Sequence, residues 1–182
     1  MRRIARSFIM VMLLCLPMKA VAQSDEQQIV VDFSTGQLWH FHTNDQPDVY
    51  QVVLPKTEVQ TTMGVSRPVH GHLTQADYKP TWWPTQNMRA GDSTLPKSVP
   101  YGNPRHPIGL FRLRIDWQNP INPNFWNPVR IHGGAKEVDL NQYKSAGCVR
   151  MLDEDIDRLV RNIEHAKGKG MVSVRVTFGY LQ

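Results

Sequence analysis

Two side chains in the C-terminal half of the chain have the chemistry that nucleophilic catalysis requires. Cys148 lies in the segment 145–151, which reads Ser-Ala-Gly-Cys-Val-Arg-Met, and His132 is followed by Gly133 in an earlier segment. A thiol is an effective nucleophile only as the thiolate, and a neighbouring imidazole both removes the thiol proton and stabilises the anion. The two residues therefore indicate Cys148 as a nucleophile and His132 as its general base.

The glycine before the cysteine suits the same chemistry. Gly147 lets the backbone bend tightly, so that main-chain N–H groups can point at an oxyanion on an attacked carbonyl. The amide of Cys148 is the first candidate donor and that of Gly147 the second. A backbone carbonyl can hold the imidazole tautomer, so no Asp or Asn is required. The residues alone still leave a buried, inert thiol as an alternative.

Residues 1–22 have the pattern of a secretory signal peptide. Three arginines precede an apolar run over 8–16, and Ala20-Val21-Ala22 has small residues where a signal peptidase reads. The apolar run is too short to span a bilayer, which needs about 20 residues. We expect cleavage after Ala22, export to the periplasm, no stable membrane span afterwards, and a single catalytic domain over 23–182. An uncleaved membrane anchor is the alternative.

The charge and the cysteines change once this leader is removed. The leader holds four of the 21 basic residues and none of the 16 acidic ones, so the remaining chain has a net charge of +1. This near-neutral charge, with no basic tract, argues against nucleic acid as a partner. Cys15 also leaves with the leader, so Cys148 has no internal disulfide partner. An unpaired thiol in an oxidising compartment is exposed to oxidation, which favours a chemical use for it.

Short apolar runs predict a mainly β domain around these residues. Strands are expected over 29–31 and 37–41, on either side of a Ser-Thr-Gly turn, and over 49–54. The stretch 57–127 is rich in Pro, Gly, Asn and Trp, and within it only 110–115 alternates like a strand. Long loops in a compact domain usually carry function.

One helix and a last strand complete this prediction. Asp153 can cap a helix that ends near Gly168, because apolar residues recur at helical spacing at Ile156, Leu159, Val160 and Ile163. Apolar and polar residues then alternate over 172–178, which is typical of a half-buried strand. Strands first, one late helix and a final strand argue against repeated βαβ units.

The motifs around His132 and Cys148 resemble the signature of the L,D-transpeptidase (YkuD) domain. The order Ile-His-Gly followed by Ser-Ala-Gly-Cys-Val-Arg-Met is similar to its periplasmic, ErfK/YbiS-like branch. Upstream segments are also similar to that branch, and with the first strands the likeness covers nearly all of the chain after the leader: 29–41, 79–84, 95–96 and 102–113.

The resemblance implies a fold, a reaction and roles for residues. The fold would be an L,D-transpeptidase-like β-sandwich or open barrel with one clear helix after the cysteine. Family members cleave the bond between the L-centre of meso-diaminopimelate and D-Ala in a peptidoglycan stem, and they form a thioester on the cysteine. Carried over by position, Gly133, Ser145 and Gly147 would shape the pocket and oxyanion hole. Arg150 would lie near the substrate or support the cysteine loop, and no cofactor is implied.

The acyl acceptor stays open at this point. It could be a second diaminopimelate, giving a 3–3 crosslink, or a lysine of an outer-membrane lipoprotein. Water would make the protein an L,D-carboxypeptidase or hydrolase, and an inert thiol would leave a wall-binding module without catalysis. Ala146 departs from the family, where many members have a second histidine, and the loop 116–128 before His132 is longer than usual.

Some aromatic and histidine residues have a second interpretation. Trp82 and Trp83 are candidates for a groove that binds glycan or stem peptide, although aromatic residues are more often part of a core. His40 and His42 alternate on one expected strand, and His70 and His72 flank a glycine. Paired imidazoles can hold zinc, but this spacing matches no zinc motif, so we expect no metal site.

Overall fold

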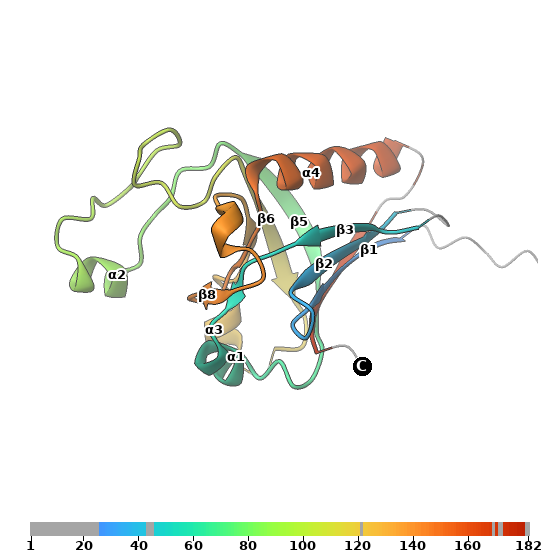
Figure 1. The fold of residues 1–182 in the computed structure, drawn as a ribbon, viewed down its shortest axis with the longest axis horizontal. Coiled ribbons are helices and arrows are strands. Elements are labelled where there is room, and N and C mark those ends of the chain that lie inside the picture. Colours follow the sequence, from blue (N-terminus) through green and yellow to red (C-terminus); the bar gives the residue numbers. More distant parts are fainter. Residues whose placement is uncertain (1–25, 43–45, 121, 169, 171–172, 181–182) are drawn as a thin grey trace, which may run out of the picture.

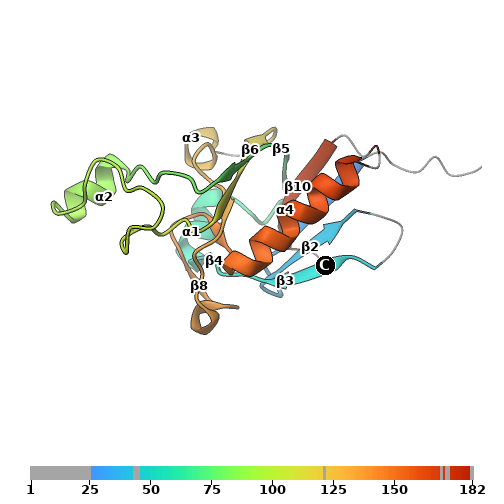
Figure 2. The same ribbon diagram turned by 90° about the horizontal axis from the view of Figure 1, so that it is seen from above.

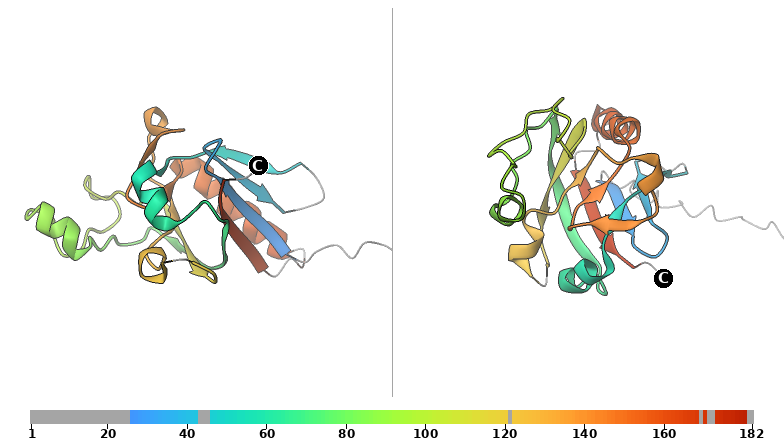
Figure 3. Two further views of the ribbon diagram at one scale, coloured as in Figure 1. Left: turned by 90° about the horizontal axis from the view of Figure 1, so that it is seen from below. Right: turned by 60° about the vertical axis from the view of Figure 1, so that its left-hand side comes forward.

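The computed structural model describes residues 26–42, 46–120, 122–168, 170 and 173–180. Its strands form a curled, eight-stranded sheet in the order β3-β2-β1-β10-β5-β6-β7-β9 (Figures 1 and 3). A separate pair joins β4 (Leu54–Pro55) to β8 (Tyr143–Ser145). The prediction of a mainly β fold with an open-barrel curvature is confirmed. The strands of the large sheet are β1 Glu26–Asp32, β2 Gln37–Phe41, β3 Asp48–Gln51, β5 Val69–Tyr78, β6 Phe111–Trp117, β7 Ile131–His132, β9 Val149–Arg150 and β10 Ser173–Gly179.

The first two strands form the predicted hairpin. The Asp32 carboxylate accepts hydrogen bonds from Ser34 N at 2.9 Å and from Thr35 Oγ1 at 2.8 Å. Gly36 has φ +69°, which glycine adopts without strain. The expected third strand over 49–54 is divided, because β3 ends at Gln51 and the chain then turns to pair β4 with β8.

The strand β5 is the main element that the sequence did not predict. Its ten residues include Gly71 and several polar side chains, so neither a clear alternation nor an apolar run marks it. A tertiary contact explains why residue 71 is a glycine, because a Cβ there would lie 2.5 Å from the carbonyl oxygen of Asp116 on β6. The two backbones approach closely at this point of their antiparallel pairing, and only a residue without a side chain fits.

The expected helix α4 spans Asp153–Gly168 and lies across β1 to β3 and β10 (Figures 1 and 2). Its buried residues include the four apolar positions that define the helical pattern. Burying each such side chain contributes about 1.5–3 kcal/mol. The last strand, β10, pairs in parallel with β1, and its buried residues Val174, Val176 and Phe178 are those the alternation predicted.

Three short helices and a 3-10 turn were not expected. They are α1 Thr57–Met63, α2 Gln86–Gly91, α3 Pro123–Trp126 and the 3-10 turn Glu137–Asp139. These elements are too short to show a helical period, and local caps define two of them. Thr85 accepts a hydrogen bond from Met88 N at the start of α2, and Asn122 precedes the first-turn Pro123 of α3.

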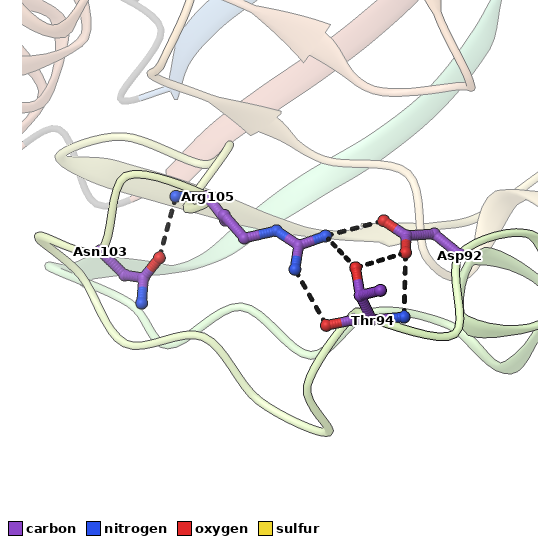
Figure 4. Close-up of polar contacts among 4 residues, drawn as sticks. All are labelled: Asp92, Thr94, Asn103 and Arg105. Atoms are coloured by element: carbon purple, nitrogen blue, oxygen red, sulfur yellow. Dashed lines mark hydrogen bonds and ion pairs between the residues drawn. The ribbon is translucent and has the colours of Figure 1, made fainter.

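The chain between β5 and β6 forms an excursion, residues 79–110, that projects from the sheet and carries α2 (Figure 1). Polar contacts tie its two arms together (Figure 4). Arg105 pairs with Asp92 at 2.7 Å and donates to the carbonyl oxygen of Thr94 at 2.9 Å. The Asn103 side chain accepts from Arg105 N at 2.9 Å. Among the described residues, no helix is long and apolar enough to cross a membrane.

Candidate active site

The parallel pairing of β7 with β9 sets the segments that carry the predicted nucleophile and base side by side. Ile131 lies opposite Val149, and both are fully buried in the core. Side chains alternate between the two faces of a strand, so the neighbours of these two residues project from the other face. His132 and Arg150 therefore share that face, and Cys148 directly precedes β9. The pairing is fixed by hydrogen bonds from Val149 N to Arg130 O at 3.0 Å and from Met151 N to His132 O at 2.8 Å.

The turn before the cysteine is held by Ser145. This side chain is fully buried, donates through Oγ to the carbonyl oxygen of Cys148, and accepts from Gly147 N at 3.3 Å. Gly147 has φ +143°, a conformation that L-residues rarely adopt. The sequence predicted a tight bend at Gly147, and the structure has it. Ala146, the departure from the family motif, is exposed on the same turn.

The imidazole of His132 is buried and held in one tautomer. Its Nδ1 lies 2.7 Å from the carbonyl oxygen of Gly133, which can only accept, so Nδ1 carries the proton. Nε2 is then the basic nitrogen. Burial lowers the pKa of His132 to about 4, while backbone hydrogen bonds to Gly133 and Ile108 act in the opposite direction. The imidazole is therefore neutral at neutral pH, which is the form that can accept a proton.

Cys148 is half-buried, and its Sγ lies 3.8 Å from the carbonyl oxygen of Pro128. Burial raises the pKa of this thiol above its ordinary value. A backbone hydrogen bond with Arg130 and the charges of Arg130, Arg150 and Arg112 oppose that shift. The resting pair is thus a neutral thiol with a neutral imidazole, and a thiolate would form only as the proton moves.

Four arginines, which are Arg112, Arg114, Arg130 and Arg150, give this face of the sheet a cationic character. Arg112 is paired with His132 across β6 and β7, and it shares the Asp77 carboxylate with Arg114 at 2.7 Å. Burial raises the pKa of Asp77, but hydrogen bonds from Arg114 and Arg112 outweigh it and hold that pKa below its usual value. The fourth, Arg150, keeps its Nε buried without a hydrogen-bond partner among the described residues. An anionic group placed here would meet several donors.

Asp153 fastens two loops of the site to the start of α4. Its Oδ1 accepts from Leu110 N at 2.9 Å and from Gly134 N at 3.0 Å. A Cβ at Gly109 or at Gly133 would lie 2.1 Å from this oxygen, so both positions require glycine. From the sequence we expected Asp153 to cap the helix. The two bonds give its carboxylate a further role, which is to hold the loop that follows His132.

The stretch 116–128 contributes two residues, Phe125 and Pro128, that lie beside the turn of Cys148. It is anchored by Trp126 in α3, which is fully buried and donates from Nε1 to the carbonyl oxygen of Met63 at 2.8 Å. Trp117 packs edge-on against it with ring centroids 4.6 Å apart. Phe125 then lies over Gly147, where a Cβ would be 3.6 Å from its ring. These contacts were missed because they join residues that are distant in sequence.

The two tryptophans predicted to bind substrate lie elsewhere, on the excursion. Trp82 is half-buried and pairs with Val99 through two backbone hydrogen bonds of 2.8 Å, and the Trp83 side chain is 61% exposed. Among the described residues, no hydrogen bond or ring contact joins either tryptophan to His132 or Cys148. Trp82 helps to hold the excursion together, and a substrate contact at either tryptophan stays a prediction.

The family model for the L,D-transpeptidase catalytic domain, YkuD, matches residues 26–176. The chain belongs to this family. Among curated L,D-transpeptidase relatives from Escherichia coli K12, the probable L,D-transpeptidase YbiS is 35% identical over 88 residues, and the probable L,D-transpeptidase ErfK/SrfK is 34% identical over 89 residues. Each match covers 46% of this chain and 25% of the relative, so the chain spans a minor part of their length.

Solved structures of L,D-transpeptidases have the same fold. The Ldtfm-avibactam carbamoyl enzyme superposes with a TM-score of 0.54 at 14% identity, over 86% of this chain and 49% of that one. A cysteine-to-serine mutant of the Enterococcus faecium L,D-transpeptidase superposes with a TM-score of 0.52 at 15% identity, over 82% and 49%. At these identities the likeness concerns the fold of the L,D-transpeptidase domain and not its substrate.

Proposed function

We propose that this domain is a cysteine L,D-transpeptidase that acts on peptidoglycan stem peptides, with Cys148 as nucleophile and His132 as general base. The observation that supports the proposal most is the parallel β7–β9 pairing, which joins the strand of His132 to the strand that directly follows Cys148. The carbonyl of Gly133 accepts from Nδ1 of His132, which supports Nε2 as the proton acceptor.

The reaction would start from the neutral pair. The Cys148 sulfur attacks the carbonyl carbon of the diaminopimelate–D-Ala bond while its proton passes to His132 Nε2. The imidazolium then gives this proton to the D-Ala amine as the C–N bond breaks, which leaves a thioester. An acceptor amine then attacks the thioester carbonyl carbon and passes its proton to His132. The Cys148 sulfur leaves and takes this proton back from the imidazolium, which restores the neutral thiol. Each proton taken up is returned, so no co-reactant is needed.

Backbone amides and arginines would stabilise the negative charge that develops. The Gly147 amide already donates to Ser145 Oγ, so the Cys148 amide is the better candidate for the oxyanion. Arg150, with its unpartnered buried Nε, is suited to a substrate carboxylate or to the oxyanion itself. Stem peptides carry several carboxylates, which fits a face with four guanidinium groups.

The direct test is release of D-Ala from a purified disaccharide tetrapeptide. We expect wild-type protein to release D-Ala and Cys148→Ala to release none, with both variants showing the same circular dichroism. Release by both proteins, or by neither, would overturn the assignment and favour a wall-binding module without catalysis.

Mass spectrometry of the products would identify the acceptor. A 3–3 linked dimer indicates a second diaminopimelate, and a tripeptide indicates water and thus a carboxypeptidase. Attachment to a lysine-ended lipoprotein peptide, added as a competing amine, indicates a lipoprotein acceptor. We propose the two amine acceptors ahead of water.

We also propose export to the periplasm with cleavage of residues 1–22. The leader pattern of arginines, an apolar run and Ala20-Val21-Ala22 supports it. N-terminal sequencing of the protein from a periplasmic fraction should begin at Gln23. A protein that keeps Met1 and stays with the membranes would contradict cleavage.

A further inference from the structure

A second group of titratable side chains lies at the other end of α4, in the sheet edge formed by β1, β2 and β3. His40 on β2 is directly opposite Asp48 on β3, and His42 follows β2. His42 Nε2 is 2.9 Å from Asp48 Oδ2, and His40 Nδ1 is 3.8 Å from the same oxygen. The three ligand atoms all lie within 4.8 Å of one another.

The surroundings of His40 fix the tautomer of its ring. The Gln27 amide nitrogen donates to the carbonyl oxygen of Ile163 on α4 at 3.2 Å, so the amide oxygen of Gln27 faces His40 Nε2 at 3.0 Å. That oxygen can only accept, and His40 Nε2 must therefore carry the proton. In the neutral ring, His40 Nδ1 then has no proton and presents its lone pair.

This lone pair has no hydrogen-bond partner. The His40 side chain is fully buried, and its Nδ1 is one of the buried polar atoms left unpaired in the described part of the chain. The carboxylate of Asp48 is also an acceptor, so two acceptors face each other across 3.8 Å. An unpaired buried acceptor costs about 1–3 kcal/mol, and a cation between the two acceptors removes this cost.

We propose that His40 Nδ1, His42 Nε2 and Asp48 Oδ2 bind a divalent transition-metal ion, with Zn²⁺ as the best fit. Two imidazoles and one carboxylate are a common zinc ligand set. Tetrahedral ligands at Zn²⁺ bond lengths of 2.0–2.1 Å lie about 3.4 Å from one another. The observed separations of 2.9 Å and 3.8 Å bracket that value. His42 would pass its Nε2 proton to Nδ1 when the ion binds.

The contacts around these ligands are those of a supported metal site. Gln27 orients His40, and the Asn162 amide on α4 donates to Asp48 Oδ2 at 2.7 Å, so both outer partners link the ligands to the helix. The side chains of His42 and Asp48 are 22% and 34% exposed, which leaves one side open for entry and for a water ligand.

The sequence did not predict this site because its third ligand comes from the next strand. The spacing of His40 and His42 matches no zinc motif, and Asp48 joins them only through the β2–β3 register. A bound metal ion would link β2 to β3 at this edge of the sheet, beneath α4. The site is independent of the thiol chemistry proposed above.

Equilibrium dialysis of tag-free protein against Zn²⁺ tests the proposal. All proteins carry Cys148→Ala, so that the active-site thiol cannot hold the metal. We expect one Zn²⁺ per chain in this parent, and binding at least about 100-fold weaker in His42→Gln and in Asp48→Asn. His165→Gln, which removes an exposed imidazole from α4, is the matched control and should bind as the parent does.

Two further readouts separate metal binding from a folding defect. At about 100 times the dissociation constant, Zn²⁺ should raise the thermal midpoint of the parent and of His165→Gln by about 5–10 °C, with little effect on the two ligand variants. Co²⁺ in place of Zn²⁺ should give the visible absorption of a four-coordinate site in the parent. No zinc binding by the parent, or equal binding by His42→Gln and Asp48→Asn, would overturn the proposal.

Discussion

At the scale of single residues, the neutral state of the thiol–imidazole pair is the central feature. Burial raises the pKa of Cys148 and lowers that of His132, so neither group is charged at neutral pH. A buried ion pair would have to be kept desolvated at rest, whereas a neutral pair separates charge only when substrate is attacked. In the proposed mechanism, the surrounding arginines would stabilise the anion that forms.

His132 also makes a pH-dependent contribution to stability. In the unfolded chain its pKa returns to 6.5, so the unfolded state binds a proton between pH 6.5 and 4 that the folded state does not. The free energy of unfolding therefore falls as the pH falls through this window, by about 3 kcal/mol at most. Above pH 7 this term is constant.

The measurement is urea unfolding of wild type and His132→Gln between pH 7.5 and 4. The glutamine variant should lose less stability on acidification, because it lacks the group that takes up the proton. Other titrating groups are common to both proteins and cancel in the difference. Parallel curves over the whole range would show that His132 is not buried in the neutral form.

Sequence analysis finds patterns among residues that are near one another in sequence. Cys148, Gly147 and Ser145 lie within a single turn, so their types and spacing were enough to predict the tight bend at Gly147. The contact of Asp153 with Leu110 was not predicted, because Leu110 is 43 positions away and no local pattern reports such a contact. The same reason hid Phe125 and Pro128 beside the thiol turn.

At the scale of elements, the start of α4 is predicted to position the catalytic loop. Asp153→Ala removes the acceptor for Leu110 N and Gly134 N, and hydrogen bonds to a charged group contribute about 1.5–3 kcal/mol each. We expect the variant to be less stable by about 2–4 kcal/mol and to be acylated at Cys148 more slowly.

Asp153→Asn is the matched control, because its amide oxygen can still accept both bonds. It should keep most of the stability and most of the acylation rate, measured by urea unfolding and by time-resolved intact mass. If Asp153→Ala is as stable and as reactive as wild type, the carboxylate does not position this loop.

The excursion is expected to be held by its own surface contacts and not by the core. Arg105→Ala removes the link between the arms at Asp92 and Thr94 (Figure 4). Because these groups are exposed, the global thermal midpoint should change little. Limited proteolysis should instead cut faster within 79–110.

Lys97→Ala, on the same excursion, is the control for removal of a positive charge without loss of that link. It should be cut at the wild-type rate. Equal cutting of Arg105→Ala and wild type would mean that the arms are held by other contacts, such as the Trp82–Val99 pairing.

At the scale of the whole molecule, the sequence predicted the fold where local periodicity and tertiary structure agree. The hairpin of β1 and β2, the helix α4 and the strand β10 all have regular apolar spacing, and each lies where expected. The strand β5 has no such spacing, since Gly71 is set by the approach of β6 and its polar side chains by the solvent. The metal-site ligands likewise become neighbours only when β2 and β3 pair.

The same organisation places the two sites at opposite ends of one helix. Asp153 at the start of α4 holds the loops around His132, and Asn162 near its end holds Asp48. The curled sheet supplies the face on which thiol, imidazole and arginines meet. The catalytic assignment therefore depends on Cys148 being reactive in this setting, despite its raised pKa.

Intact mass spectrometry of the protein mixed with a carbapenem tests that assignment most directly. Wild type should gain the mass of one carbapenem, Cys148→Ala should gain none, and His132→Gln should gain it about 100-fold or more slowly. An adduct on both wild type and Cys148→Ala, or on neither while circular dichroism shows both folded, would contradict Cys148 as the nucleophile.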